Sequence, residues 1–194
     1  MDYYDLKVLA RRVRAENGLT STRVLQTDLR RIYFKYGIEI DYWPYRFKYV
    51  RGAFMCDDLG TTVMLAQNLP HDPMVFTMAH ELKHFLVDRA LRVSYCDQSN
   101  IANRIEVGAE VFAAEFLFPD RYFVDYMEQM RIKRRECAAQ TIVELKRATR
   151  TSLSYKGLAI KAERLGYALP GSLSSYTGWR KLERLSRQQS WNRR

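Results

Sequence analysis

Residues 71–88 read HDPMVFTMAHELKHFLVD, and this stretch decides the fold around it. Its apolar residues recur every three or four positions, which is typical of an amphipathic helix. Asp72 is a suitable N-cap, and Pro73 is a suitable first helical residue. The spacing therefore predicts a helix over about residues 73–88.

His80 and His84 lie four residues apart in this predicted helix. Residues at positions i and i+4 share one helix face about 6 Å apart along the axis, so both imidazoles can reach one Zn²⁺. Glu81 follows the first histidine and completes the H-E-x-x-H arrangement of zinc hydrolases. In that chemistry the metal activates a water molecule, and the glutamate moves its proton to the leaving amine. The motif predicts a catalytic zinc site with Glu81 as the general base.

A catalytic zinc ion usually takes three protein ligands and a water molecule, so a third protein ligand is expected in addition to the two histidines. Residues 103–119 read NRIEVGAEVFAAEFLFP and belong to a helix predicted over about residues 100–117. Glu106 and Glu110 lie four residues apart on one face of it. One can bind the metal, and the other can accept the free ring N–H of a ligand histidine. An exposed acidic stripe is the alternative interpretation of this pair.

Residues 76–85 and 106–119 resemble the corresponding segments of the ImmA/IrrE-type metallopeptidases, and the resemblance extends over about residues 20–165. The leading glutamate of the second segment is the third zinc ligand in that family, so the resemblance implies this role for Glu106. It also implies a gluzincin-like α+β fold. A small, mostly antiparallel sheet would pack on the H-E-x-x-H helix, the glutamate helix would follow, and the C-terminal half would be mainly helical.

The sequence departs from the family pattern at three positions near the site. Lys83 and Glu110 stand where glycine and asparagine are usual, and Gly108 stands where a second glutamate is frequent. None of the three changes removes a ligand. We expect Lys83 either to face solvent or to alter the charge of the cleft, and Glu110 to be a hydrogen-bond partner of His80 or His84.

The segments before the active helix predict the sheet. Residues 38–43 alternate with period two, and residues 52–56 and 61–66 read as two further strands. The turn-like residues between the last two predict a hairpin. We expect residues 89–99 to form a loop.

Two helices are predicted ahead of the strands. The first spans residues 3–16, and the second begins after Thr20 or Ser21 as the N-cap and ends at Gly37.

The C-terminal part reads as helical over residues 120–165, with a break near residues 149–154. Residues 135–166 look like the helix–turn–helix-like element of the same family. We therefore predict one metallopeptidase domain over residues 1–169, followed by a basic tail over residues 170–194. Helix–turn–helix shapes recur outside DNA binding, so packing on the catalytic body is the favoured role of these helices.

Charge is spread unevenly along the chain, whose net charge is +10. Residues 1–130 hold 16 Lys and Arg against 18 Asp and Glu, whereas residues 131–194 hold 16 against 4. A basic C-terminal third favours an acidic partner such as nucleic acid, and a solvated surface is the alternative. Residues 179–185 either bind phosphates and bases through arginine and tryptophan or form an amphipathic helix that docks on the body.

The remaining composition excludes several classes of protein. The chain is 47% hydrophobic and 28% charged, which is typical of a globular protein. It has no apolar stretch long enough for a membrane span, and its start lacks the features of a secretory signal, so we expect a cytoplasmic protein. Cys56, Cys96 and Cys137 form no C-x-x-C pair and read as reduced thiols.

These observations predict a zinc-dependent endopeptidase with His80, His84 and Glu106 as ligands and Glu81 as the base. Mn²⁺ or Fe²⁺ can occupy the same ligand set. The resemblance implies a regulatory protease that cleaves a helix–turn–helix transcriptional repressor in stress-response or prophage circuits. The alternatives are a zinc-stabilised protein that binds a repressor without cutting it, and a nucleic-acid-binding protein that acts through its basic third.

Overall fold

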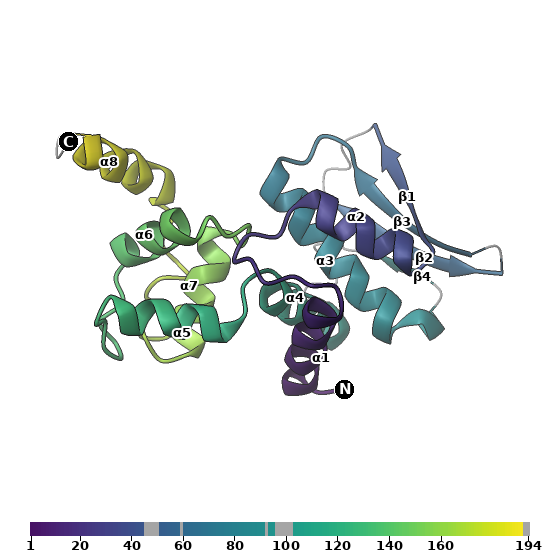
Figure 1. The fold of residues 1–194 in the computed structure, drawn as a ribbon, viewed down its shortest axis with the longest axis horizontal. Helices are drawn as coiled ribbons and strands as arrows, with labels where there is room; N and C mark the ends of the chain where they lie inside the picture. The colour runs from purple at the N-terminus through teal and green to yellow at the C-terminus, as the bar shows by residue number, and fades with distance from the viewer. Residues whose placement is uncertain (45–50, 59, 92, 96–102, 192–194) are drawn as a thin grey trace. The chain divides into compact units, whose positions relative to one another are not determined.

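A computed structural model gives the fold of the protein (Figure 1). The chain divides into two compact units, Met1–Leu117 and Phe118–Arg194. The first holds the sheet and the H-E-x-x-H helix, and the second is helical. The structure describes residues 1–44, 51–58, 60–91, 93–95 and 103–191.

In its described part, the sheet of the first unit has the strand order β1-β3-β2-β4. Strand β1 runs parallel to β3, whereas the β2–β3 and β2–β4 pairs are antiparallel. The β2–β3 pair is the predicted hairpin, with Phe54 opposite Val63 and both side chains fully buried. This sheet and the helices around it confirm the predicted α+β fold. The strands are β1 (Ile38–Trp43), β2 (Gly52–Asp57), β3 (Gly60–Ala66) and β4 (Val93–Tyr95).

Strand β4 lies in the segment that was expected to be a loop. A short 3₁₀ helix over Arg89–Leu91 precedes it, and its three residues pair with Ala53, Phe54 and Met55 of β2. A strand this short is determined by the neighbour with which it pairs rather than by its own pattern. Residues 92 and 96–99 of the expected loop, among them Cys96, lie outside the described residues.

The helices of the first unit follow the predicted order, with corrected starts. The second helix begins at Gln26, so the prediction of Thr20 or Ser21 as its cap is wrong. Instead, the carboxylate of Asp28 accepts the backbone N–H of Leu25 at 2.9 Å. The helices are α1 (Tyr3–Glu16), α2 (Gln26–Lys35), α3 (His71–Val87) and α4 (Arg104–Leu117).

Helix α3 begins at His71, two residues before the predicted start, because Pro70 rather than Asp72 is its N-cap. Its apolar side chains pack against β2 and β3 on one side and against α2 and α4 on others. Helix α3 is therefore enclosed over most of its length, and the polar residues of the H-E-x-x-H motif lie inside the unit.

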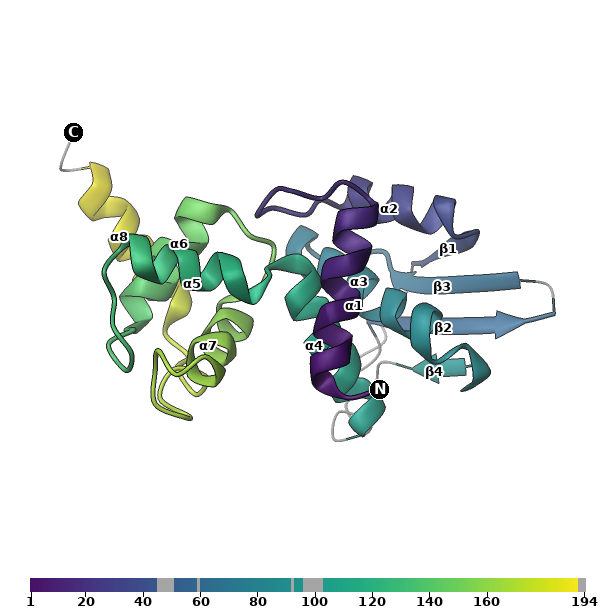
Figure 2. The ribbon, with the colours of Figure 1, turned by 60° about the horizontal axis from the view of Figure 1, so that its bottom comes forward.

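Helix α4 is fixed from its other side by α1, which lies alongside it (Figure 2). The buried guanidinium of Arg14 donates to the carbonyl oxygens of Phe116 and Ser21 at 2.5 and 2.7 Å. Arg11 forms an ion pair with the fully buried carboxylate of Glu115 at 2.8 Å. These contacts fix the rotation of α4 about its axis and therefore the direction in which its glutamates point.

The second unit contains a helix–turn–helix-like pair, α6 and α7. The carbonyl oxygens of Thr151 and Leu153 in the turn accept hydrogen bonds from Lys146 at 2.8 and 2.9 Å. The helical segment predicted over residues 120–165 has a further break between α5 and α6, where Arg131 and Arg135 have positive φ. The helices are α5 (Asp120–Gln129), α6 (Ala139–Thr149), α7 (Tyr155–Arg164) and α8 (Trp179–Trp191).

Helix α8 occupies much of the segment predicted as a basic tail. It packs on α6, where Arg147 donates to Ser186 Oγ at 2.7 Å. The ring of Trp179 stacks on Tyr155 at a centroid distance of 5.4 Å. Residues 179–185 therefore lie in a helix that packs on α6 and α7 within the second unit. None of the helices among the described residues has the length and apolar character needed to cross a bilayer.

Candidate metal centre

His80, His84 and Glu106 come together inside the first unit. The Nε2 atom of His80 lies 3.1 Å from Glu106 Oε2 and 3.2 Å from His84 Nε2. The remaining pair, His84 Nε2 and Glu106 Oε1, is 3.6 Å apart. All three side chains are buried, and each offers one donor atom within 4.8 Å of the others. Two imidazoles and one carboxylate are the protein ligands of many catalytic zinc sites, so this cluster fits a divalent metal ion.

The rotation of α4 separates its two candidate glutamates. Glu106 lies on the buried stripe that continues through Ala109 and Ala113, whereas Glu110 is exposed. The structure therefore places Glu106 in the cluster and Glu110 at the surface. The alternative interpretation, an exposed acidic residue, describes Glu110 and not Glu106.

Asp88, and not Glu110, is the carboxylate that contacts the Nδ1 side of the His84 ring. Its Oδ2 atom lies 2.9 Å from His84 Nδ1. This contact fixes the imidazole with Nε2 toward His80 and Glu106, which is how outer carboxylates orient metal-binding histidines. Asp88 was not among the predicted site residues, although a carboxylate four residues after the second histidine of the motif is a signal for such a partner.

The charges of the cluster favour an anionic carboxylate. Burial alone would raise the pKa of Glu106, but hydrogen bonds with His80 and His84 outweigh burial and hold it well below its usual value. Burial would lower the pKa of His84, but hydrogen bonds with Asp88 and Glu106 raise it. Metal binding at such a cluster displaces protons.

Glu81 is fully buried beside the cluster, and neither carboxylate oxygen has a hydrogen-bond partner among the described residues. Burial raises its pKa to about 7, and the nearby His80 and His84 counteract only part of that effect. A buried carboxylate without a partner is costly, and such groups concentrate at functional sites. This orphaned side chain fits a base that acts on a water molecule held by a neighbouring metal ion.

The backbone of β2 approaches Glu81 closely at Gly52. A Cβ atom at this position would lie 2.5 Å from Thr77 Cγ2 and 2.9 Å from Glu81 Oε1. Only glycine leaves room for both side chains. A glycine inside a predicted strand often marks such a close approach, which is the signal that could have identified Gly52 from the sequence.

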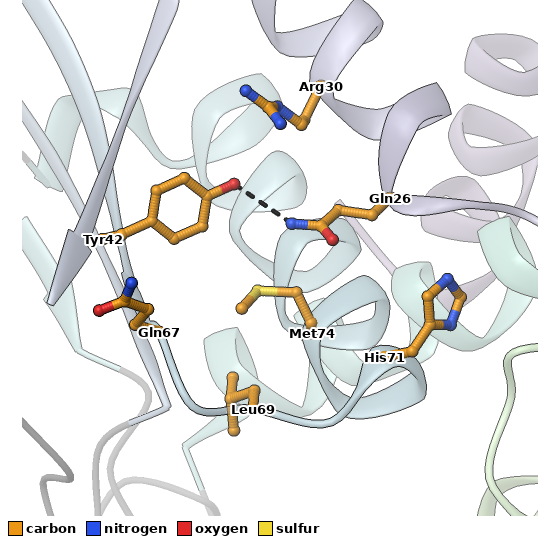
Figure 3. A pocket seen from close by; sticks show the side chains of 7 residues that line it. All are labelled: Gln26, Arg30, Tyr42, Gln67, Leu69, His71 and Met74. Atoms are coloured by element: carbon orange, nitrogen blue, oxygen red, sulfur yellow. Dashed lines mark hydrogen bonds between the residues drawn. The ribbon is translucent and has the colours of Figure 1, made fainter. Parts of the chain in front are cut away.

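A separate pocket of about 420 Å³ lies between α2, β1 and the start of α3 (Figure 3). The amide of Gln26 donates to the hydroxyl of Tyr42 across it at 3.2 Å. None of the three cluster residues lines it, and neither does Glu81, so the pocket is distinct from the candidate metal centre. Its lining residues are Gln26, Arg30, Tyr42, Gln67, Leu69, His71 and Met74.

Comparisons with known proteins bear on the fold and the family of the chain. The comparison with curated proteins finds no match. Among solved structures, the chain is similar to a Mycobacterium tuberculosis transcriptional regulator, with a TM-score of 0.58 and 17% sequence identity. The match covers 87% of this chain and 48% of the regulator, so the chain spans about half the length of that protein. Likeness at this identity concerns the fold alone.

The model of the IrrE N-terminal-like domain, which is classed as a peptidase family, matches residues 35–162. The match contains β1, the whole H-E-x-x-H helix, the glutamate helix α4 and most of α7. It confirms the resemblance found in the sequence: this chain belongs to the family of IrrE N-terminal-like domains.

Proposed function

We propose that the protein is a zinc-dependent endopeptidase in which His80, His84 and Glu106 hold the ion. Glu81 is the general base in this proposal. The observation that carries it is the orphaned, fully buried Glu81 carboxylate beside a His-His-Glu cluster. Membership of a peptidase family supports the same conclusion.

The side chains divide the reaction between them. A bound zinc ion would polarise the scissile carbonyl and acidify a water molecule. Glu81 takes the proton of that water on a carboxylate oxygen and then delivers it to the leaving amine. Asp88 keeps the His84 ring oriented through Nδ1 while these steps occur.

We further propose that the substrate is a helix–turn–helix transcriptional repressor, cleaved in the cytoplasm during a stress or prophage response. This part of the proposal rests on the resemblance to the ImmA/IrrE-type metallopeptidases and on the family match. A regulatory protease of this kind would relieve repression by destroying the repressor.

The test combines the zinc-loaded protein with a purified helix–turn–helix repressor encoded in a neighbouring reading frame, and mass spectrometry identifies the products. We expect cleavage at a defined peptide bond, its loss on chelation and its return with added Zn²⁺. An intact repressor in the presence of zinc-loaded protein would contradict the substrate proposal. If the wild-type protein and Glu81→Gln relieve repression equally, binding without proteolysis is the function.

Gly52→Ala is expected to lower both stability and cleavage. The added methyl group collides with Thr77 and Glu81, and overpacking of this kind costs about 1–3 kcal/mol. Adding Thr77→Ser removes the closer of the two colliding atoms and should restore most of the thermal stability. Cleavage should stay low in the double variant, because the methyl group still displaces the Glu81 carboxylate. Full recovery of both properties would show that Gly52 serves packing alone.

A second candidate function is nucleic-acid binding by the second unit. That unit holds 17 Lys and Arg against 7 Asp and Glu, whereas the first unit holds 15 against 15. Exposed basic residues of α8 include Arg180, Lys181 and Arg184. Trp179 covers Tyr155 at the start of α7, the part of a recognition helix that normally contacts bases. We therefore propose contact with phosphates rather than base reading.

Replacing Arg180, Lys181 and Arg184 together by glutamine should weaken binding to a DNA duplex and flatten its salt dependence. The slope of log K against log salt is negative, and each lost phosphate contact reduces its magnitude by about 0.9. Titrations at several salt concentrations measure this slope. The control replaces three exposed arginines of the first unit, Arg12, Arg23 and Arg30, and should change little. Equal slopes for both triple variants would contradict the assignment to α8.

A further inference from the structure

Lys83 lies between the two histidines of the motif, and its charged side chain is buried inside the first unit. Only 3% of the side chain is exposed. A buried ammonium group is costly unless hydrogen bonds and an opposite charge compensate it. Of the two expectations for Lys83, exposure to solvent or a change in the charge of the cleft, its burial excludes the first.

The ammonium group of Lys83 connects the two helices that carry the metal cluster. Its Nζ atom lies 2.5 Å from Asp88 Oδ2 and 2.9 Å from the carbonyl oxygen of Ile105. The same Asp88 oxygen is the partner of His84 Nδ1. Ile105 directly precedes Glu106 in the first turn of α4. Lys83 therefore reaches His84 through Asp88 and reaches the backbone beside Glu106 directly.

Gly108 of α4 leaves space for the Lys83 side chain. A Cβ atom at Gly108 would touch Lys83 Cε and Nζ at 3.6 Å and would crowd Leu6 Cδ1 at 3.0 Å. A larger side chain at that position would compete with the lysine for the same volume. The absence of a side chain at Gly108 thus allows the ammonium group to lie against α4.

We propose that Lys83 is a positioning residue of the metal centre, which holds His84 and Glu106 at metal-binding separation by bridging Asp88 and the Ile105 carbonyl. This inference rests on the proposed metal site. Lys83 does not contact the ion or the substrate in this role. It fixes the ring orientation of one ligand and the backbone position of another.

The test measures Zn²⁺ affinity by competition with a chromophoric chelator, together with the visible absorption spectrum of the Co²⁺-substituted protein. Lys83→Met retains the length of the side chain and removes its charge. We expect it to weaken Zn²⁺ binding about 10–100-fold, the usual effect of losing a group that supports a metal ligand, and to alter the Co²⁺ spectrum. Lys83→Arg keeps the positive charge and a donor for both acceptors, so it should bind Zn²⁺ more tightly than Lys83→Met.

A purely structural role makes a different prediction. Lys83→Met would then lower the melting temperature of the metal-free protein, while affinity and the Co²⁺ spectrum stayed unchanged, and that result overturns the proposal. If Lys83→Met does not fold, Asp88→Asn interrupts the same bridge from its other end, and unchanged affinity in this variant also overturns it. Failure of the wild-type protein to bind Zn²⁺ would instead refute the metal site itself.

Discussion

Glu81→Gln is expected to lower the rate of repressor cleavage about a thousandfold while Zn²⁺ binding stays within about twofold of wild type. An amide cannot accept the proton of the attacking water, and a general base typically contributes a factor of about 10²–10⁴. Glu81 is not one of the three cluster residues, so the ligands remain in place. Cleavage rates and zinc stoichiometry, measured on the same preparations, check both parts of this prediction.

Glu110→Gln is the matched control, because it makes the same chemical change at an exposed position of α4. It should leave cleavage unchanged. A Glu81→Gln protein that kept more than about a tenth of the wild-type rate would mean that another group acts as the base.

Glu81→Gln should also change the stability of the metal-free protein. Burial raises the pKa of Glu81 from 4.5 to about 7, so folding favours its protonated form. The contribution of Glu81 to stability is therefore complete below pH 4.5 and is lost as pH rises through about 7. Glutamine carries no charge at any pH. Urea unfolding should show the variant about 3 kcal/mol more stable than wild type at pH 8 and equal to it below pH 4.5. An advantage that did not vary with pH would contradict this explanation.

Glu106→Gln is expected to weaken Zn²⁺ binding by on the order of several hundredfold. Structural zinc sites gain roughly 10–16 kcal/mol from about four ligands, so one ligand contributes about 2.5–4 kcal/mol. Glutamine also removes the negative charge that faces His80 and His84. Competition with a chelator of known affinity measures the loss.

The position of the substitution decides the interpretation of that result. Glu110→Gln, four residues further along the same helix, should bind Zn²⁺ like the wild-type protein. If the two variants bound zinc equally well, the third ligand would lie elsewhere, and the hydrolase proposal would lose its geometric basis.

The sequence sufficed where the relevant contact is local. The helical spacing of His80 and His84 follows from residues within one turn, and it predicted their common face correctly. Spacing alone could not decide whether Glu106 or Glu110 lies beside the two histidines, because the two glutamates are four residues apart on one predicted face of the same helix. The choice depends on the rotation of α4, which Arg14 and the α1 packing fix from a distant part of the chain.

The errors have the same physical origin. Strand β4 exists because β2 offers an edge with which it pairs, and nothing in its own three residues indicates this. Helix α2 starts where the carboxylate of Asp28 accepts the backbone N–H of Leu25. Thr20 and Ser21 also carry side-chain oxygens that can accept a backbone N–H, but they lie several residues before this start. Lys83 could not be placed from its own position, since its partners, Asp88 and Ile105, belong to the end of one helix and the start of another.

The orphaned carboxylate of Glu81 has a consequence for the lifetime of the protein in a cell. A divalent ion beside it would favour its charged form and strengthen the folded state near neutral pH. Chains without the ion unfold more often, and housekeeping proteases remove chains that unfold. If the proposed metal site is correct, scarcity of the ion would therefore reduce the abundance of this protein as well as the fraction of chains that carry the ion.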